Sequence, residues 1–169
     1  KTYARSAVPT LSYSDSNQCN VNKIYIDHLI GKIGEIAARK ALEFHQFAVE
    51  GPDFTIYEAK KKSWISDLIV NGVGVAVKTQ TSQSAKRYGL SWTFQCSEKR
   101  RDPILETPNS IVCFVECNDA DAHFACCVYP PQRIKRLLLK HPRLKHLIGK
   151  KLVVYDADLM RNEIDDGIT

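Results

Sequence analysis

Apolar residues recur at helical spacing in the first third of the chain. The spacing of three and four residues is typical of one face of an amphipathic helix and predicts a helix from about residue 26 to 47. This is the strongest periodic signal present, and its apolar positions are Leu29, Ile30, Ile33, Ile36, Ala37, Ala41 and Phe44.

Beyond this helix the pattern changes to short apolar runs bounded by turn residues, which predicts strands. A second helix is expected over residues 130–139, where Pro130-Pro131 suits a first turn that needs no amide donor. The strands are expected at about residues 54–57, 65–70, 73–79, 90–95, 111–116, 123–129 and 151–155.

This order of elements predicts an α/β protein of the α+β type, in which helices flank a mixed central sheet. Residues 24–169 suit a single domain with a sizeable core, and residues 1–23 lack periodicity and are expected to form an arm or the remnant of a linker. No glycine-rich loop joins a strand to a helix, so a Rossmann or P-loop protein is not expected.

One predicted hairpin carries candidate chemistry. Its two strands flank Asn71-Gly72, the dipeptide that best tolerates the positive φ angles of a tight turn. Asp67 therefore lies across from the segment that contains Lys78. Because side chains alternate along a strand, residue 76, Lys78 and Gln80 share one face, where Gln80 could bind water, phosphate or a base edge.

A second acid is expected to join this hairpin from the first helix. Glu35 lies in a stripe of small residues that includes Gly31 and Gly34, which would let the helix approach the sheet closely and aim Glu35 at it. The alternative is a surface salt bridge between Glu35 and Arg39, one turn later.

With an acid, a hairpin and a following lysine, the chain resembles the PD-(D/E)xK family, the restriction-endonuclease-like nucleases. The matches are Asp67, Lys78 and the helical Glu35, over about residues 27–156, and Ala76 stands where the pattern has a second acid. The resemblance implies a restriction-endonuclease-like core and a DNA endonuclease that uses Mg²⁺ or Mn²⁺. It implies metal ligands at Asp67, position 76, the Val77 carbonyl and Glu35, with Lys78 orienting the attacking water. Cutting both strands of a duplex implies a homodimer or a higher symmetric assembly.

Ala76 leaves two interpretations of function open. One is a nuclease of the restriction, homing or junction type that has been inactivated by an acid-to-alanine change. The other is a non-catalytic module that binds DNA or a protein, and an RNA-directed nuclease is a third, less favoured possibility. A literal match, Pro52-Asp53 followed by Glu58-Ala59-Lys60, leaves too few residues between the acids for two strands and a turn, so it ranks lower.

The basic composition favours a polyanionic partner, here double-stranded DNA. The net charge is +5 and the isoelectric point is about 8.9. A C-terminal basic series is expected to be an ordinary solvated face, and its members are Lys140, Arg143, Lys145, Lys150 and Lys151. The residues expected to contact DNA are Lys60, Lys61, Lys62, Lys86, Arg87, Tyr88, Lys99, Arg100 and Arg101.

The cysteines and the lengths of the apolar runs narrow the class of protein further. The six cysteines mostly fall inside predicted strands, which suits buried thiols better than disulfides or a zinc site. No apolar run approaches the roughly 18 residues that a membrane span needs, and no signal peptide is apparent, so a soluble, intracellular protein without a small-molecule cofactor is expected.

Overall fold

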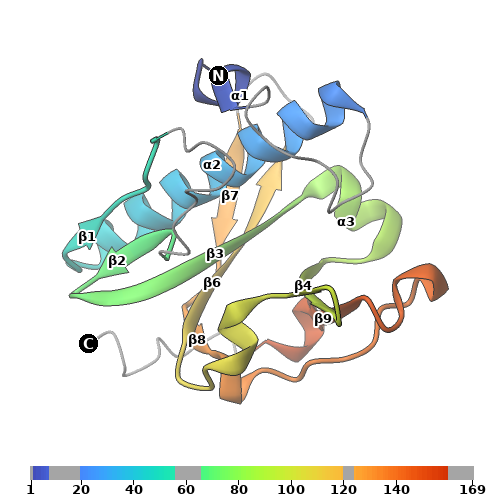
Figure 1. The fold of residues 1–169 in the computed structure, drawn as a ribbon. Coiled ribbons are helices and arrows are strands. Elements are labelled where there is room, and N and C mark those ends of the chain that lie inside the picture. The colour runs from blue at the N-terminus through green and yellow to red at the C-terminus, as the bar shows by residue number, and fades with distance from the viewer. Residues whose placement is uncertain (1, 8–19, 56–65, 120–123, 160–169) are drawn as a thin grey trace.

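A long helix lying across a twisted mixed sheet forms the centre of the molecule (Figure 1). The structure is a computed structural model that describes residues 2–7, 20–55, 66–119 and 124–159. Its helices are α1 (Thr2–Ala7), α2 (Val21–Phe44) and α3 (Ser82–Tyr88). Its strands are β1 (Val49–Glu50), β2 (Leu68–Val70), β3 (Val73–Thr81), β4 (Ser91–Ser97), β5 (Arg100–Arg101), β6 (Ile111–Asn118), β7 (Ala125–Val128), β8 (Gln132–Arg133) and β9 (Lys151–Tyr155).

The central sheet is mixed, as the sequence predicted. Its strands follow the order β1-β2-β3-β6-β7, with β8 paired to β6. The first three strands form an antiparallel meander, β6 runs parallel to β3, and β7 and β8 are antiparallel to β6. A second, antiparallel sheet has the order β5-β4-β9.

The predicted hairpin is confirmed. Asn71 and Gly72 form the turn between β2 and β3 with φ angles of 48° and 79°. In this register Leu68 lies opposite Val75. Positive φ at both central residues is what a two-residue hairpin turn requires.

Both faces of the central sheet are covered, so the core has two layers. On one face α2 packs Ala38 and Leu42 against Leu68 and Val75. On the other face Trp92 and its neighbours from the second sheet pack against β6. Strand β6 is therefore buried from both sides, which explains why its residues from Ile111 to Val115 form a continuous apolar run instead of alternating.

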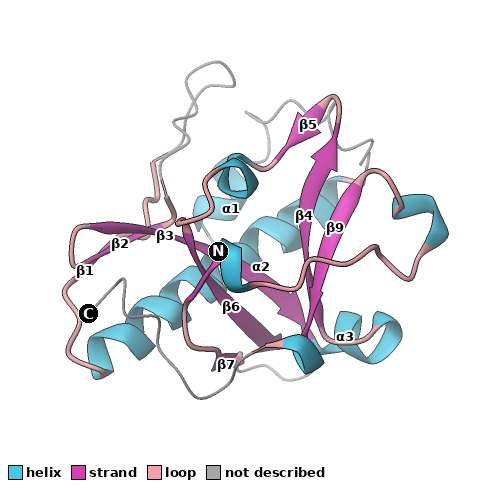
Figure 2. Ribbon diagram, turned by 90° about the horizontal axis from the view of Figure 1, so that it is seen from below, coloured by secondary structure: helices cyan, strands magenta, loops and turns pink. Residues whose placement is uncertain are grey.

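Some predicted elements differ from the structure. The helix predicted at 130–139 is wrong: the chain instead pairs as β8 and continues into a short 3-10 turn, Ile134–Arg136. The amide of Ile134 donates to the carbonyl of Ser110, so sheet pairing satisfies the backbone here. As a result a small antiparallel sheet, and not a second helix, covers the face of the central sheet opposite α2 (Figure 2).

The sequence also missed several short elements and misplaced some boundaries. Helix α2 begins five residues before its predicted start, after Asn20, whose side chain accepts a hydrogen bond from the Lys23 amide. Helix α3 follows Thr81, whose hydroxyl caps its first turn. Strand β1 lies at Val49–Glu50, whereas residues 54 and 55 are not in a strand and residues 56–57 lie outside the described part.

The N-terminal stretch contains a helix that packs on the domain. Ala4 of α1 is buried, and α1 contacts α2. Tyr3 of α1 meets Phe54 edge to face with ring centroids 5.6 Å apart. Within the described residues, no helix is long and apolar enough to cross a membrane.

Candidate functional site

Helix α2 lies unusually close to β3, and a glycine permits it. A Cβ atom added to Gly34 would collide with the side chain of Thr79, whose hydroxyl oxygen is buried among the described residues without a hydrogen-bond partner. The next helical residue, Glu35, is buried at 8% exposure. The predicted close approach is thus present at Gly34, whereas a Cβ at Gly31 would meet nothing within 4 Å, so Gly31 has no part in it.

Glu35 is paired with a lysine from its own helix. The Lys32 ammonium lies 2.6 Å from Oε2 of Glu35. Arg39 instead bonds Glu43 at 2.8 Å and donates to the Gly51 carbonyl. The alternative of a surface Glu35–Arg39 salt bridge is therefore wrong.

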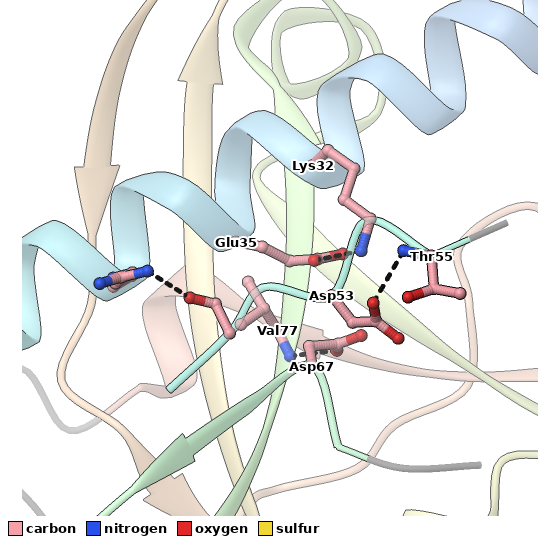
Figure 3. Close-up of polar contacts among 8 residues, drawn as sticks. Lys32, Glu35, Asp53, Thr55, Asp67 and Val77 are labelled. Atoms are coloured by element: carbon pink, nitrogen blue, oxygen red, sulfur yellow. Dashed lines mark hydrogen bonds and ion pairs between the residues drawn. The ribbon is translucent and has the colours of Figure 1, made fainter. Parts of the chain in front are cut away.

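Two further acids lie near Glu35, and the Glu35 carboxyl binds a proton more tightly than an ordinary glutamate does. The pKa of Glu35 is raised from its ordinary value of 4.5 to about 7, mainly by burial; Lys32 opposes this rise, and the negative charges of Asp67 and Asp53 contribute to it. Figure 3 shows Glu35, Asp53 and Asp67 arranged around the junction of α2, the segment after β1 and the start of β2. This acidic cluster, Glu35, Asp53 and Asp67, is the candidate site.

Asp67 is tied to β3 at the point where the resemblance expects a metal ligand. Its Oδ2 accepts a hydrogen bond of 2.8 Å from the Val77 amide (Figure 3). Strand β2 begins at Leu68, whose partner on β3 is Val75, so Asp67 lies just before the paired residues.

The other predicted residues on β3 point away from α2. Val75 and Val77 pack on the α2 side, whereas Ala76 packs against the cluster that contains Trp92. The Lys78 ammonium lies 2.8 Å from Asp102 and 4.9 Å from the centre of the Phe94 ring, also on this second face.

The Gln80 side chain bonds backbone groups and is therefore not free to bind a ligand. Its side chain accepts from the Ser91 amide at 2.7 Å and donates to the Gly89 carbonyl at 3.3 Å. These bonds join β3 to the start of β4, which favours the structural role of Gln80 over contact with a base edge.

The proposed DNA-contacting residues lie in separate places. Lys86, Arg87 and Tyr88 are exposed at the end of α3. Residues 99–101 are exposed around the β4–β5 turn, where Arg101 lies 3.6 Å from Glu106. Residues 60–62 lie outside the described part of the chain.

The acidic cluster supplies only part of the ligand set that a hard divalent cation needs. Among residues 2–7, 20–55, 66–119 and 124–159, no group of three or more His, Cys, Asp or Glu side chains is placed to hold a metal ion. Mg²⁺, however, commonly uses only one or two protein carboxylates and completes its shell with water and phosphate. Glu35 and Asp67 supply two, and Ala76 supplies no side-chain ligand.

A hollow beside α2 does not coincide with the acidic cluster. A cavity of about 530 Å³ lies between the first half of α2 and the end of β3. Its lining includes Asp27, Thr79 and Ser84 but none of the three clustered acids.

The described cysteines are free thiols. Cys113 is buried on β6, and Cys117 lies opposite Cys126 in the β6–β7 pairing. Burial raises the pKa of Cys113 to about 12, which keeps this thiol protonated. Cys113 and Cys117 are thus buried strand residues, as the sequence indicated, whereas Cys127 on β7 is exposed.

Sequence reasoning missed three charged residues that shape these surroundings. Lys32 precedes Glu35 by three residues, a spacing that predicts a helical pair. Asp53 belongs to the less favoured Pro52-Asp53 motif, and no sequence pattern predicts its place beside Glu35, which depends on the loop after β1. Asp102 pairs with Lys78 across 24 residues of sequence, and no local signal indicates such a contact.

Comparison of this chain with protein-family models, with curated proteins and with solved structures finds no match.

Proposed function

We propose that this chain is a metal-dependent DNA endonuclease domain of the restriction-endonuclease-like type, impaired by alanine at position 76. The observation that carries the proposal is the meeting of two acids from distant elements beside β3. Glu35 from α2 is buried within the electrostatic reach of Asp67, and Asp67 is held against β3 by the Val77 amide.

The order of elements supports the same proposal. The helix α2 is followed by an antiparallel meander, β1 to β3, and then by β6, which is parallel to β3. A helix followed by a strand meander is the order of elements that fits the nuclease core implied by the resemblance. Fold alone does not specify activity, so the acidic cluster carries the functional part of the proposal.

Each residue would have a distinct role. Glu35 and Asp67 would hold Mg²⁺, which supplies polarisation of the phosphate and a water of lowered pKa when it is bound. The Lys32 ammonium offsets the negative charge of Glu35. Lys78, kept in place by Asp102, would reach the substrate phosphate only by exchanging that partner.

Restoring the missing acid tests the proposal. Nicking of supercoiled DNA is measured with Mg²⁺ for the chain as given, for Ala76→Glu, and for Ala76→Glu combined with Asp67→Asn. We expect Ala76→Glu to raise the cleavage rate at least tenfold and the added Asp67→Asn to abolish the gain. If Ala76→Glu is folded and as inactive as the original chain, the nuclease proposal is wrong.

The second candidate is a non-catalytic DNA-binding module, and one observation favours it. Ala76 packs against an apolar cluster and Lys78 is already paired with Asp102, so neither residue is set up for catalysis. DNA affinity that is unaffected by EDTA and by Lys78→Ala, together with an inactive Ala76→Glu variant, would select this function. Cleavage by Ala76→Glu would exclude it.

A further inference from the structure

We propose that a surface formed by Arg87, Tyr88, Arg143 and Tyr155 binds the phosphate backbone of duplex DNA. We call it the paired-arginine surface. The proposal rests on DNA being the ligand of the proposed function, and it assigns part of the contact to the C-terminal third of the chain, where the sequence predicted only a solvated face.

Two arginines on this surface are each held over an aromatic ring. The Arg87 guanidinium carbon lies 5.1 Å from the centre of the Tyr88 ring, and that of Arg143 lies 4.7 Å from the Tyr155 ring. The Arg143 amide also donates to the Tyr155 hydroxyl at 3.1 Å. Because Tyr155 ends β9 and is half-buried, the loop that bears Arg143 is anchored to the second sheet.

The two pairs adjoin each other at a glycine. Gly89 follows Tyr88 directly and has a φ angle of 84°. A Cβ atom added there would lie 3.3 Å from Nη1 of Arg143. Ser91 at the start of β4 pairs with Tyr155 at the end of β9, which brings the end of α3 to this corner of the second sheet (Figure 2).

Within the described part of the chain, neither Arg87 nor Arg143 forms a salt bridge, whereas Arg39 pairs with Glu43. Stacking on a ring holds a guanidinium flat without using its five N–H donors. Arg87 and Arg143 are exposed, so these donors can bind phosphate oxygens in the bidentate manner that arginine favours.

The surface is rigidly connected to the strand that borders the acidic cluster. The Gly89 carbonyl accepts from the Gln80 side chain, and Gln80 follows Lys78 by two residues on β3. A duplex held by the paired-arginine surface would therefore be fixed relative to β3. This geometry points to a positioning role for the arginines, since they do not belong to the acidic cluster.

Binding without cleavage tests this inference. Fluorescence anisotropy of a short labelled DNA duplex is followed in EDTA across a series of salt concentrations. We expect Arg143→Ala and Arg87→Ala each to weaken binding roughly tenfold and to reduce the slope of log K against log salt by about one. Lys145→Ala, an exposed cation in the same loop without an aromatic partner, is the matched control and should change the affinity less than about twofold.

Two further variants separate stacking from charge. Arg143→Lys keeps the charge but loses the planar fork, so we expect it to recover less than half of the lost binding energy. Tyr155→Leu removes the ring beneath Arg143 and should weaken binding in the wild-type background, with no further effect in Arg143→Ala. Equal binding by Arg143→Ala and Lys145→Ala, both with unchanged melting temperatures, would overturn the inference.

Failure of this inference is distinguishable from failure of the nuclease proposal. If Ala76→Glu cuts DNA while Arg143→Ala binds normally, only the paired-arginine surface is wrong. If Ala76→Glu stays inactive while Arg143→Ala loses affinity, the surface stands and the nuclease proposal falls. Absence of any duplex binding by the unaltered chain would refute the surface directly.

Discussion

Replacing Glu35 by glutamine is predicted to remove a pH-dependent cost of folding. The carboxyl is buried beside Asp67 and Asp53, so its charged form is disfavoured in the folded protein (Figure 3). Glutamine has nearly the same shape and carries no charge. It should fill the site without the penalty that ionisation of Glu35 imposes.

The size of this effect follows from the two pKa values. The pKa of Glu35 is about 7 in the folded chain against an ordinary 4.5, so the folded state binds a proton more tightly than the unfolded state. The free energy of unfolding should therefore fall as the pH rises from about 4.5 to 7 and then level off, with a total loss of about 3 kcal/mol. Below pH 4.5 the penalty is absent because both states hold the proton.

The measurement is urea unfolding of both proteins at several pH values between 4.5 and 8. The difference in unfolding free energy between Glu35→Gln and the original chain should shift by about 3 kcal/mol over this range in favour of the glutamine variant. The pKa of about 7 already includes the opposing effect of Lys32, so loss of this ion pair does not change the expected shift. Glu43→Gln, which breaks an exposed pair with Arg39 on the same helix, is the control and should show little pH-dependent shift.

One outcome would refute the reasoning on Glu35. If Glu35→Gln follows the same pH dependence as the original chain, the carboxyl is not the buried, charge-disfavoured group described above. Mg²⁺ adds a separate test of the proposed site at pH 8. A cation bound by ionised Glu35 and Asp67 should raise the unfolding free energy of the original chain more than that of Glu35→Gln.

Further predictions concern packing and thiol reactivity. Gly34→Ala should lower the unfolding free energy by about 1–3 kcal/mol because its methyl group collides with Thr79, whereas Gly31→Ala should raise it by about 0.5–1 kcal/mol, and equal effects in urea unfolding would contradict the close helix–strand contact. Iodoacetamide at pH 8 should modify exposed Cys127 but leave Cys113, whose pKa is raised to about 12 by burial, intact in mass spectra of the native chain. Rapid labelling of Cys113 would show that β6 is not enclosed on both faces.

Local signals in the sequence were sufficient for the helix and the hairpin. Apolar spacing predicts α2, although the Asn20 cap extends it at the start. Asn71-Gly72 predicts the turn between β2 and β3, because few other dipeptides adopt positive φ at both positions. The mixed α/β class follows from these elements and their order.

The same signals failed where a distant segment decides the structure. Residues 130–139 have a helical start signal, yet Ile134 donates to Ser110 and the chain joins the sheet through β8. The sequence of these ten residues carries no information about β6, the distant strand with which β8 pairs. Tertiary pairing therefore overrides the local preference.

The sequence by itself determined which chemical groups β3 and α2 carry, and that Glu35 belongs to a helix with a glycine beside it. Helical spacing alone pairs Glu35 with Lys32, whereas only the tertiary structure decided that Asp67 lies near Glu35 and that Lys78 pairs with Asp102 on the opposite face of the sheet. The physical reason is that side-chain direction follows local periodicity, whereas ion pairing and burial depend on which remote segments pack against each face. Alternation on β3 thus placed Ala76 and Lys78 together, and packing separated them from Glu35.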